Sequence, residues 1–338
     1  MTVNLLDILP YIDKNLTYRT MRKILLALLL LFAVLNSNGQ ELNSPQLSQY
    51  LADNPFVLSP TYAGIGDHIK IRLNGLAQWV GIKDAPRTQS LAADMRLGEK
   101  SGVGLFLYND KNGYTKQQGA RVSFAHHLTL DRYDDEFLSF GLSYNFNQFR
   151  IDTEQFNLLD FPDNGVVNNR QTANHNFDVG VLYRFDKFYF NLNASNLINK
   201  DPRNLTFNID EPNELRNYYA YTGYRYTKNK NSRLEIEPSI LFKLFESDGR
   251  SETDLNLKFR WYDFEDYYYA GLNYRFLNDQ IGKPLYVAPF VGLKKSNFYF
   301  GYSYQIILNE ILGYSTGTHV ITIGVDLFQG ISNCRCTY

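Results

Sequence analysis

The stretch LSFGLSYNF, residues 138–146, decides the fold class. Leu, Phe, Leu, Tyr and Phe occupy every second place from the first, and Ser, Gly, Ser and Asn stand between them. Successive side chains of a β-strand point to opposite faces. The alternation therefore predicts a strand with one apolar and one polar face.

The same alternation recurs in FYFGYSYQI (298–306), ITIGVDL (321–327) and LNLKFRW (255–261), and turn clusters such as NDKNG (109–113) separate the segments. Helical periodicity is nearly absent after residue 39. The pattern predicts fourteen strands, an even number typical of an outer-membrane barrel. Twelve or sixteen remain alternatives, because strand bounds read from sequence shift by about 2–4 residues. The predicted strands are 67–80, 86–97, 101–109, 114–130, 135–149, 172–184, 187–195, 214–227, 232–245, 250–262, 265–277, 283–294, 296–308 and 316–328.

Composition excludes several classes of protein. A net charge of −1 provides no field for holding nucleic acid or an anionic membrane surface. Aromatic residues make up 15% of the chain, which excludes intrinsic disorder. No apolar stretch of about 18 residues follows residue 35, which excludes a helical membrane protein.

A soluble β-protein is the main alternative to a barrel in lipid, and two observations favour lipid. Aromatic residues such as Trp261 and Phe328 stand at predicted strand ends, as in the interfacial girdles of a barrel. Charged residues lie deep within the polar strand faces, where a dry core would desolvate them at a cost of several kcal/mol each. These predicted lumen charges are Glu235, Glu237, Lys258, Arg260 and Arg275. Pro238 and Pro289 argue against two strands, because proline cannot donate a ladder hydrogen bond.

The N-terminus predicts export. Residues 21–39 combine a basic start, a run of 12 apolar residues from Ile24 to Leu35 and a polar end, which is the layout of a signal peptide. Cleavage is expected between Gly39 and Gln40, and residues 1–20 resemble an upstream extension. A membrane anchor or a buried core helix is the alternative for the apolar run. The mature protein is therefore expected in the outer membrane.

The predicted architecture is all-β: a transmembrane antiparallel β-barrel of about 14 strands over residues 67–328. A short periplasmic or plug-like segment (40–66) precedes it, and a tail (329–338) that carries Cys334 and Cys336 follows. The segment 40–66 is rich in Gln, Asn, Ser and Pro, so it suits neither strands nor helix interiors. It is read as a docking strap or a plug, with a poorly ordered leader as the alternative.

Two further features of this architecture are expected. Tyr50, Phe56 and Tyr62 recur every six residues of the segment 40–66, which favours packed anchors. The long loops 150–171 and 196–213 follow odd-numbered strands, so they face outward if both chain ends are periplasmic.

Residues for catalysis or for binding a cofactor or metal are not brought together. His126 and His127 are adjacent in a predicted strand, so they point to opposite faces. Glu235 and Glu237 share a face about 7 Å apart; an acid–base pair is conceivable, but charges balanced by the neighbouring strand explain them better. The GVG at 102–104 lacks the third glycine and the helix of a nucleotide loop. We therefore predict no enzyme and no cofactor.

The N-terminal block carries a resemblance to a known family. PQLSQY (45–50), NP (54–55) and SPTYAG (59–64) are followed by QWVGI (78–82) and APRTQS (85–90). This order and spacing resembles the PorP/SprF family of outer-membrane proteins associated with type IX secretion and gliding in Bacteroidetes. Further matches are LEIEPS (234–239), DLN (254–256), AGLNYR (270–275) and GTH (317–319).

The resemblance implies a helper protein, which supports export or surface display of a partner such as a large adhesin, or docks periplasmic machinery or a peptidoglycan-binding protein. A channel for small solutes is the alternative, and a hydrolase using Glu235 or His175 is a further one. Trp79 is explained equally well as an interfacial aromatic. The family-motif residues, which are candidates for partner docking, are Pro45, Gln46, Ser48, Gln49, Tyr50, Asn54, Pro55, Pro60, Tyr62, Ala63, Gly64, Gln78, Trp79, Gly81, Pro86, Thr88 and Gln89.

Overall fold

The computed structural model divides the chain into two units, residues 1–39 and 40–338. It describes residues 49–131, 135–151, 171–199, 203–204, 209–210, 216–229, 232–246, 249–281, 284–308, 313 and 315–329, all in the second unit. The predicted signal peptide, Pro45, Gln46, Ser48 and both cysteines lie outside these residues. No helix among the residues described is long and apolar enough to cross a membrane.

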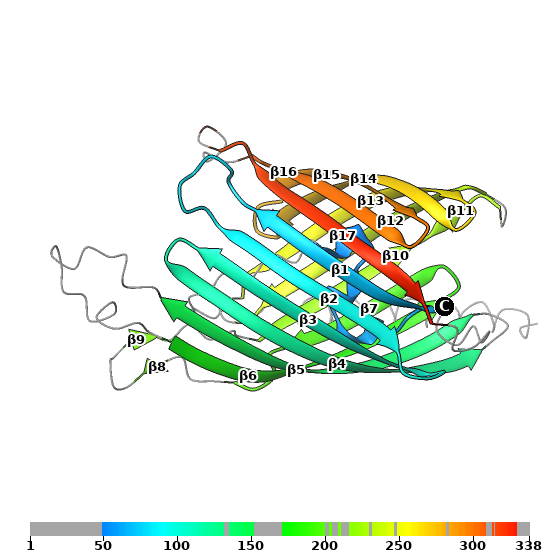
Figure 1. The fold of residues 1–338 in the computed structure, drawn as a ribbon, viewed down its shortest axis with the longest axis horizontal. Helices are drawn as coiled ribbons and strands as arrows, with labels where there is room; N and C mark the ends of the chain where they lie inside the picture. The colour runs from blue at the N-terminus through cyan, green and yellow to red at the C-terminus, as the bar shows by residue number, and fades with distance from the viewer. Residues whose placement is uncertain are drawn as a thin grey trace, which may run out of the picture. The chain divides into compact units, whose positions relative to one another are not determined.

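The second unit is a closed antiparallel β-barrel of 14 strands, as the sequence predicts (Figure 1). β10 and β11 flank Arg225 and form one strand, since both pair with β12. Every observed bound lies within three residues of its prediction. The strands are β1 (His68–Ala77), β2 (Arg87–Arg96), β3 (Ser101–Asn112), β4 (Thr115–Asp131), β5 (Glu136–Ile151), β6 (Gln171–Phe185), β7 (Phe188–Ser195), β10 (Asn217–Tyr224), β11 (Tyr226–Thr227), β12 (Leu234–Phe245), β13 (Ser251–Asp263), β14 (Asp266–Leu277), β15 (Pro284–Lys295), β16 (Phe298–Ile307) and β17 (Thr318–Phe328).

The first and last strands close the barrel. β1 pairs with β17 from His68 opposite Phe328 to Ala77 opposite His319. A separate two-stranded pair, β8 (Arg203–Asn204) and β9 (Ile209–Asp210), lies in the connection between β7 and β10. Pairing of β1 with β17 leaves the described barrel wall without an unpaired edge, as a strand-built wall requires in lipid.

The two faces of the wall have the polarity expected in lipid. In β5, Phe140 and Leu142 are 46% and 50% exposed, whereas Ser139 and Ser143 are 0% and 1% exposed. Apolar side chains therefore point outward and small polar ones inward, the reverse of a soluble β-protein.

Pro284 opens β15, whereas Pro238 and Pro289 lie inside their strands, each beside an interruption in one hydrogen-bond ladder. Pro238 of β12 lies beside the break between β10 and β11, between the pairs Gly223–Ser239 and Tyr226–Ile236. Pro289 of β15 lies in a stretch where β15 and β16 make no ladder pair. The wall thus accommodates each proline without leaving its missing N–H opposite a ladder acceptor.

The two ends of the barrel differ in their connections. At one end, β1 begins, β17 ends, and two-residue turns join β6 to β7, β13 to β14 and β15 to β16. We call this the short-turn end. The connections from β1 to β2, from β5 to β6 and from β7 to β10 lie at the opposite end.

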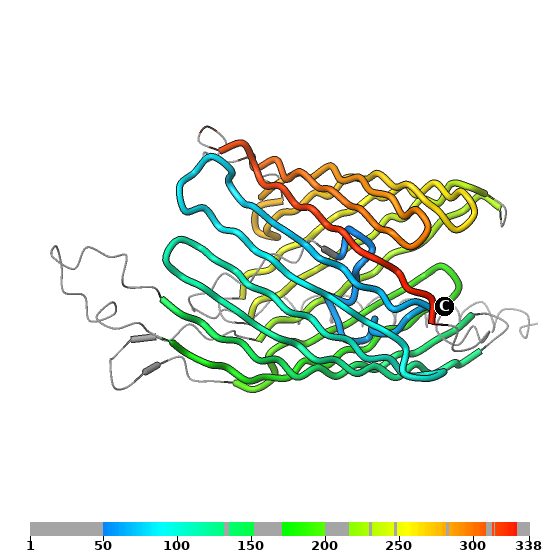
Figure 2. Tube along the Cα trace, viewed as in Figure 1, coloured from blue at the N-terminus to red at the C-terminus, as the bar shows by residue number. Residues whose placement is uncertain are grey.

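Residues Gln49–Gly66, here the inner segment, lie inside the barrel (Figure 2). They form three short 3-10 turns, η2 (Gln49–Ala52), η3 (Pro55–Val57) and η4 (Pro60–Tyr62). η4 packs against β4, β5 and β6, and η3 packs against β2. The core of the molecule therefore consists of this segment and the inward faces of the strands.

Candidate functional site

Proline sets the local structure of the inner segment. Pro55 and Pro60 open η3 and η4, where the fixed φ of proline suits the start of a turn and its missing N–H costs nothing. The Ser59 hydroxyl accepts a hydrogen bond from the Thr61 backbone N–H and so caps η4. The chain can thus fold compactly without a strand partner.

Glycines in the wall make room for the inner segment. A Cβ at Gly102 would lie 2.1 Å from the Ala63 oxygen, and one at Gly141 would lie 2.5 Å from the Thr61 nitrogen. Neither position has space for a side chain. The wall therefore fits this segment closely. Alanine at Gly102 or Gly141 would force either the wall or the inner segment to move.

Side chains of the wall also bind the backbone of the inner segment. The Arg121 guanidinium donates to the Phe56 and Val57 carbonyls at 3.1 and 2.9 Å. The buried His127 ring lies 3.0 Å from the Ala63 carbonyl through Nε2. These contacts satisfy carbonyls that irregular backbone would otherwise bury without partners.

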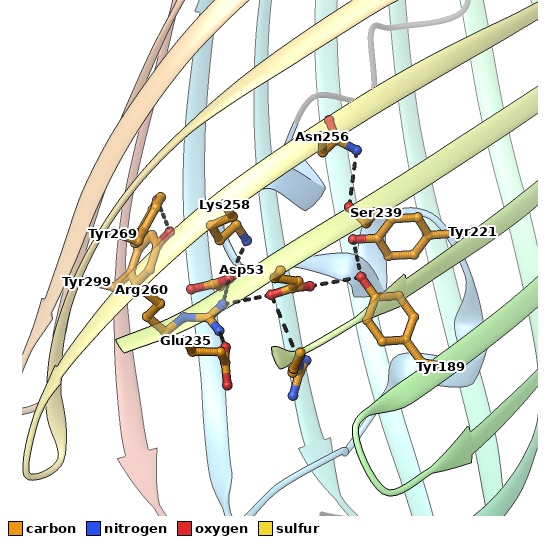
Figure 3. A network of polar contacts seen from close by, with 12 residues as sticks. Asp53, Tyr189, Tyr221, Glu235, Ser239, Asn256, Lys258, Arg260, Tyr269 and Tyr299 are labelled. Carbon is orange, nitrogen blue, oxygen red and sulfur yellow. Dashed lines mark hydrogen bonds and ion pairs between the residues drawn. The ribbon is translucent and has the colours of Figure 1, made fainter. Parts of the chain in front are cut away.

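Asp53 is the only charged residue of the inner segment. Its carboxylate accepts hydrogen bonds from Lys258 Nζ at 2.8 Å and Arg260 Nη2 at 2.7 Å (Figure 3). Burial alone would raise the pKa of Asp53, but the charges of Arg260 and Lys258 outweigh burial and hold this pKa well below its usual range. Asp53 is therefore ionised at neutral pH and joins the segment to β13.

The predicted lumen charges all lie on the inner face and are buried. Arg260 pairs with Glu235 (Figure 3). It also pairs with Glu237 at 3.4 Å. Arg275 is 5% exposed and pairs with Asp254 of β13. Ion pairs with neighbouring side chains therefore hold these charges on the inner face of the wall. A buried charge without such a partner would be strongly destabilising.

Tyr50, which precedes Asp53 near the start of the inner segment, is a further anchor. Its hydroxyl donates to Asp254 at 2.5 Å, and its ring packs edge-on against Tyr221 with 5.5 Å between centroids. Burial, and then the Asp254 charge, raise the pKa of Tyr50 well above its ordinary value, so this hydroxyl stays protonated. Tyr50 therefore serves as a neutral donor to a buried carboxylate.

A cavity of about 370 Å³, here the mouth cavity, lies between the inner segment and the wall. Most of its wall residues come from the short-turn end of their strands. Its lining includes Asn54, Tyr62, Arg184, Asp186, Lys187, Phe188, Tyr189, Arg225 and Glu237.

The structure divides the family-motif residues into two groups. The inner-segment group, with Pro55 and Pro60 opening its turns, is buried: Tyr50, Asn54, Tyr62 and Ala63 are each at most 8% exposed. Gly64, also buried, donates its N–H to Asp94 at 3.0 Å. Gln49 begins η2. A partner at the barrel surface could not reach the buried side chains unless the segment moved.

The second group lies in the connection from β1 to β2 and at the start of β2, at the opposite end. Gln78 donates its N–H to the Pro86 carbonyl at 2.9 Å, and buried Thr88 bonds Asp110. Trp79 packs against inward-facing residues of β15 and β16, including Tyr286. Gly81 and Gln89 are exposed. The predicted docking residues therefore do not form one surface.

Sequence reasoning missed three contributors to the lumen. Asp53 could have been noticed as the lone charge in a polar segment. The hydroxyl of Tyr189 lies 3.0 Å from that of Tyr221 and donates to Glu237 at 2.8 Å. Tyr189 and Tyr221 gave no usable signal, because alternating tyrosines are also what an outward face contains.

Glu235 and His175, the residues named for the hydrolase alternative, lie on opposite faces of the wall. His175 lies on the outer face, where its ring contacts Tyr144 and Phe146, while Glu235 lies on the inner face. The two cannot share an active site. Among the residues described, no group of three or more His, Cys, Asp or Glu side chains could hold a metal ion.

Solved structures of similar architecture include hydrocarbon channels and an outer membrane protein. The monoaromatic hydrocarbon channel CymD matches with a TM-score of 0.49 and 11% identity over 82% of this chain and 92% of that chain. A TodX hydrocarbon-channel mutant matches with a TM-score of 0.46 and 8% identity, over 86% and 94%. Omp33 of Acinetobacter baumannii matches with a TM-score of 0.40 and 10% identity, over 78% and 100%. No curated protein matches the chain.

The family comparison covers most of the chain. The model of the type IX secretion system membrane protein PorP/SprF matches residues 39–325. This range contains every barrel strand to within a few residues, together with the inner segment. The chain therefore belongs to the PorP/SprF family of type IX secretion system membrane proteins.

Proposed function

We propose that this protein is an outer-membrane, non-catalytic accessory of type IX secretion that holds partner proteins at its short-turn end. Family membership supports the link to secretion. The short turns, the start of β1 and the end of β17 would face the periplasm, as in bacterial outer-membrane barrels. The partners would be periplasmic machinery, a peptidoglycan-binding protein or a large secreted adhesin.

One observation carries the proposal. The inner segment fills the lumen, and it is fixed by the Asp53 ion pairs, by Arg121 and by close contact with wall glycines. A barrel filled by its own chain suits a rigid platform better than a passage for solutes. The charged mouth cavity is the feature that favours the alternative, a channel for small solutes.

Partner capture tests the proposal. The full chain would be isolated from gently solubilised outer membranes of its host, and co-purifying proteins identified by mass spectrometry. Type IX components or a secreted cargo should co-purify, and deletion of the gene should reduce that cargo outside the cell. A fully folded barrel that captures neither, and whose deletion leaves secretion unchanged, would contradict the proposal.

The role of the N-terminal segment is tested separately. A variant lacking residues 40–62 but keeping the signal would be compared with the full chain, with heat-dependent gel mobility reporting barrel folding. If this segment contributes to docking, the folded variant loses the partners. If the folded variant keeps the same partners, the docking surface lies on the barrel alone.

A further inference from the structure

Two buried polar groups of the inner segment line the mouth cavity without a hydrogen-bond partner. Tyr62 is 8% exposed and Asn54 is 4% exposed. The Tyr62 hydroxyl and the Asn54 Nδ2 have no hydrogen-bond partner among the described residues. Burying a polar group without a hydrogen-bond partner lowers stability, because the group loses its hydrogen bonds to water. Unmet donors beside a cavity indicate where a ligand would supply acceptors.

A positively charged residue, Arg225, also lines the mouth cavity. Arg225 interrupts the strand between β10 and β11, and its side chain is 54% exposed. Its guanidinium stands 5.8 Å from the Tyr189 ring centroid, and its ion pair with Glu237 is long, at 3.9 Å. The position that breaks the ladder thus places an arginine at the cavity.

The charges of two arginines, Arg225 and Arg184, affect the pKa of Tyr62. Burial, and after it Tyr221 and the charge of Glu237, raise the pKa of Tyr62 well above its ordinary value, while the charges of Arg225 and Arg184 act in the opposite direction. Both guanidinium groups therefore act on the unmet hydroxyl. Two cations beside an unmet hydroxyl and an unmet amide favour an anionic guest.

We propose that the mouth cavity binds a peptide segment with a free carboxylate, an Asp or Glu side chain or a chain end, between Arg225, Tyr62 and Asn54. This rests on the proposed function, because it specifies the chemistry by which a partner protein is held. The cavity, at about 370 Å³, has the size of a small-ligand site. A segment entering from the short-turn end would reach it directly.

The lining favours a peptide carboxylate over phosphate. Asp186 and Glu237 also line the cavity, and both would repel a doubly charged anion more than a singly charged one. A peptide also has backbone N–H groups, which can donate hydrogen bonds to these carboxylates. Phe188 and Tyr189 provide apolar surface for the rest of the segment.

Direct binding tests the proposal. The full chain in detergent would be titrated into a fluorescein-labelled, C-terminally amidated Gly-Ala-Asp-Ala-Gly peptide and its Asn counterpart, with anisotropy as the readout. We expect the Asp peptide to bind about tenfold more tightly, as for a hydrogen bond to a charged group. R225Q should abolish this preference, and Tyr62→Phe should reduce it. Inorganic phosphate should compete weakly.

The control is Arg216→Gln, which removes an arginine of similar charge that pairs with Glu246 at the opposite end. It should keep the preference for the Asp peptide. Equal binding of both peptides to the wild type, equal losses in both arginine variants, or phosphate displacing the peptide at equal concentration would each overturn the proposal. Because R225Q removes a half-exposed side chain, heat-dependent gel mobility should report a folded barrel.

Partner capture separates this inference from the proposed function. If wild type and R225Q capture the same secretion partners equally well, the carboxylate site is wrong while the accessory role stands. If neither captures a partner, the accessory role itself fails. Loss of capture by R225Q alone, with Arg216→Gln unaffected, supports both.

Discussion

The carboxylate of Asp53 lies 2.7 Å from the guanidinium of Arg260 and so ties the inner segment to β13. The rest of the described segment has no charge, so its hold on the wall depends on this ion pair, on hydrogen bonds and on close packing. An attachment of this kind can be weakened by single substitutions without altering the strands.

Asp53→Asn should loosen the inner segment. Removing one partner of a buried ion pair costs about 3 kcal/mol here, the lower end of the usual range, because Arg260 keeps Glu235 and Glu237. Chymotrypsin, which cuts after Tyr and Phe, should then cleave at Tyr50 or Phe56 much faster than in the wild type. Asp279→Asn, an exposed loop substitution, is the control and should change nothing. Equal cleavage of D53N and wild type would contradict the attachment.

The attachment should also depend on pH in one direction. The pKa of Asp53 is lowered in the attached state, where Arg260 and Lys258 outweigh the effect of burial. The attached state therefore keeps its full advantage above the ordinary Asp pKa of about 3.9 and loses it as the pH falls below that value. The difference between wild type and D53N in hydrogen-exchange protection of the inner segment, corrected for the intrinsic exchange rate at each pH, should stay constant from about pH 8 to 5 and shrink below about pH 4. A difference that shrinks already above pH 5 would show another group to be responsible.

Gly141→Ala should displace the segment by steric contact alone. A methyl group there would lie 2.5 Å from the Thr61 nitrogen, and overpacking of this kind costs about 1–3 kcal/mol. Leu58 is 1% exposed, so a cysteine there, with Cys334 and Cys336 changed to Ser, reports exposure through maleimide labelling.

Labelling of that cysteine should be faster with Gly141→Ala than without it. The matched control is Gly75→Ala in β1, where an added Cβ meets nothing within 4 Å. It should leave labelling unchanged. If both alanine variants label alike, the inner segment does not depend on the space that Gly141 provides.

The outer face should behave as a lipid contact. Leu142 lies in the middle of β5 and is 50% exposed, so Leu142→Arg should cost about 2–4 kcal/mol of folding into lipid vesicles. Phe298→Arg, at the end of β16, should cost about 0–1 kcal/mol because it lies near an interface. Urea titration of vesicle-folded protein measures both, and equal costs would contradict the assignment of the face.

The strands could be predicted from sequence because apolar and polar residues alternate within each strand, as in residues 138–146. The burial of Tyr50, Phe56 and Tyr62 agrees with their expected role as packed anchors. Where those anchors dock could not be predicted. Asp53 accepts a hydrogen bond from Lys258, which lies some two hundred residues later in the chain, and the Thr61 backbone packs against Gly141. Such contacts depend on how the closed barrel curves, and no local pattern in an irregular segment reports that.

The role proposed for the inner segment requires that it block ion flow through the lumen, and ion conductance in planar bilayers tests this directly. The purified wild-type barrel should carry no steady current above the empty bilayer, whereas D53N and Gly141→Ala should open to measurable, voltage-stable currents. Large steady currents from the wild type, equal to those of the variants, would contradict the account and favour a solute channel.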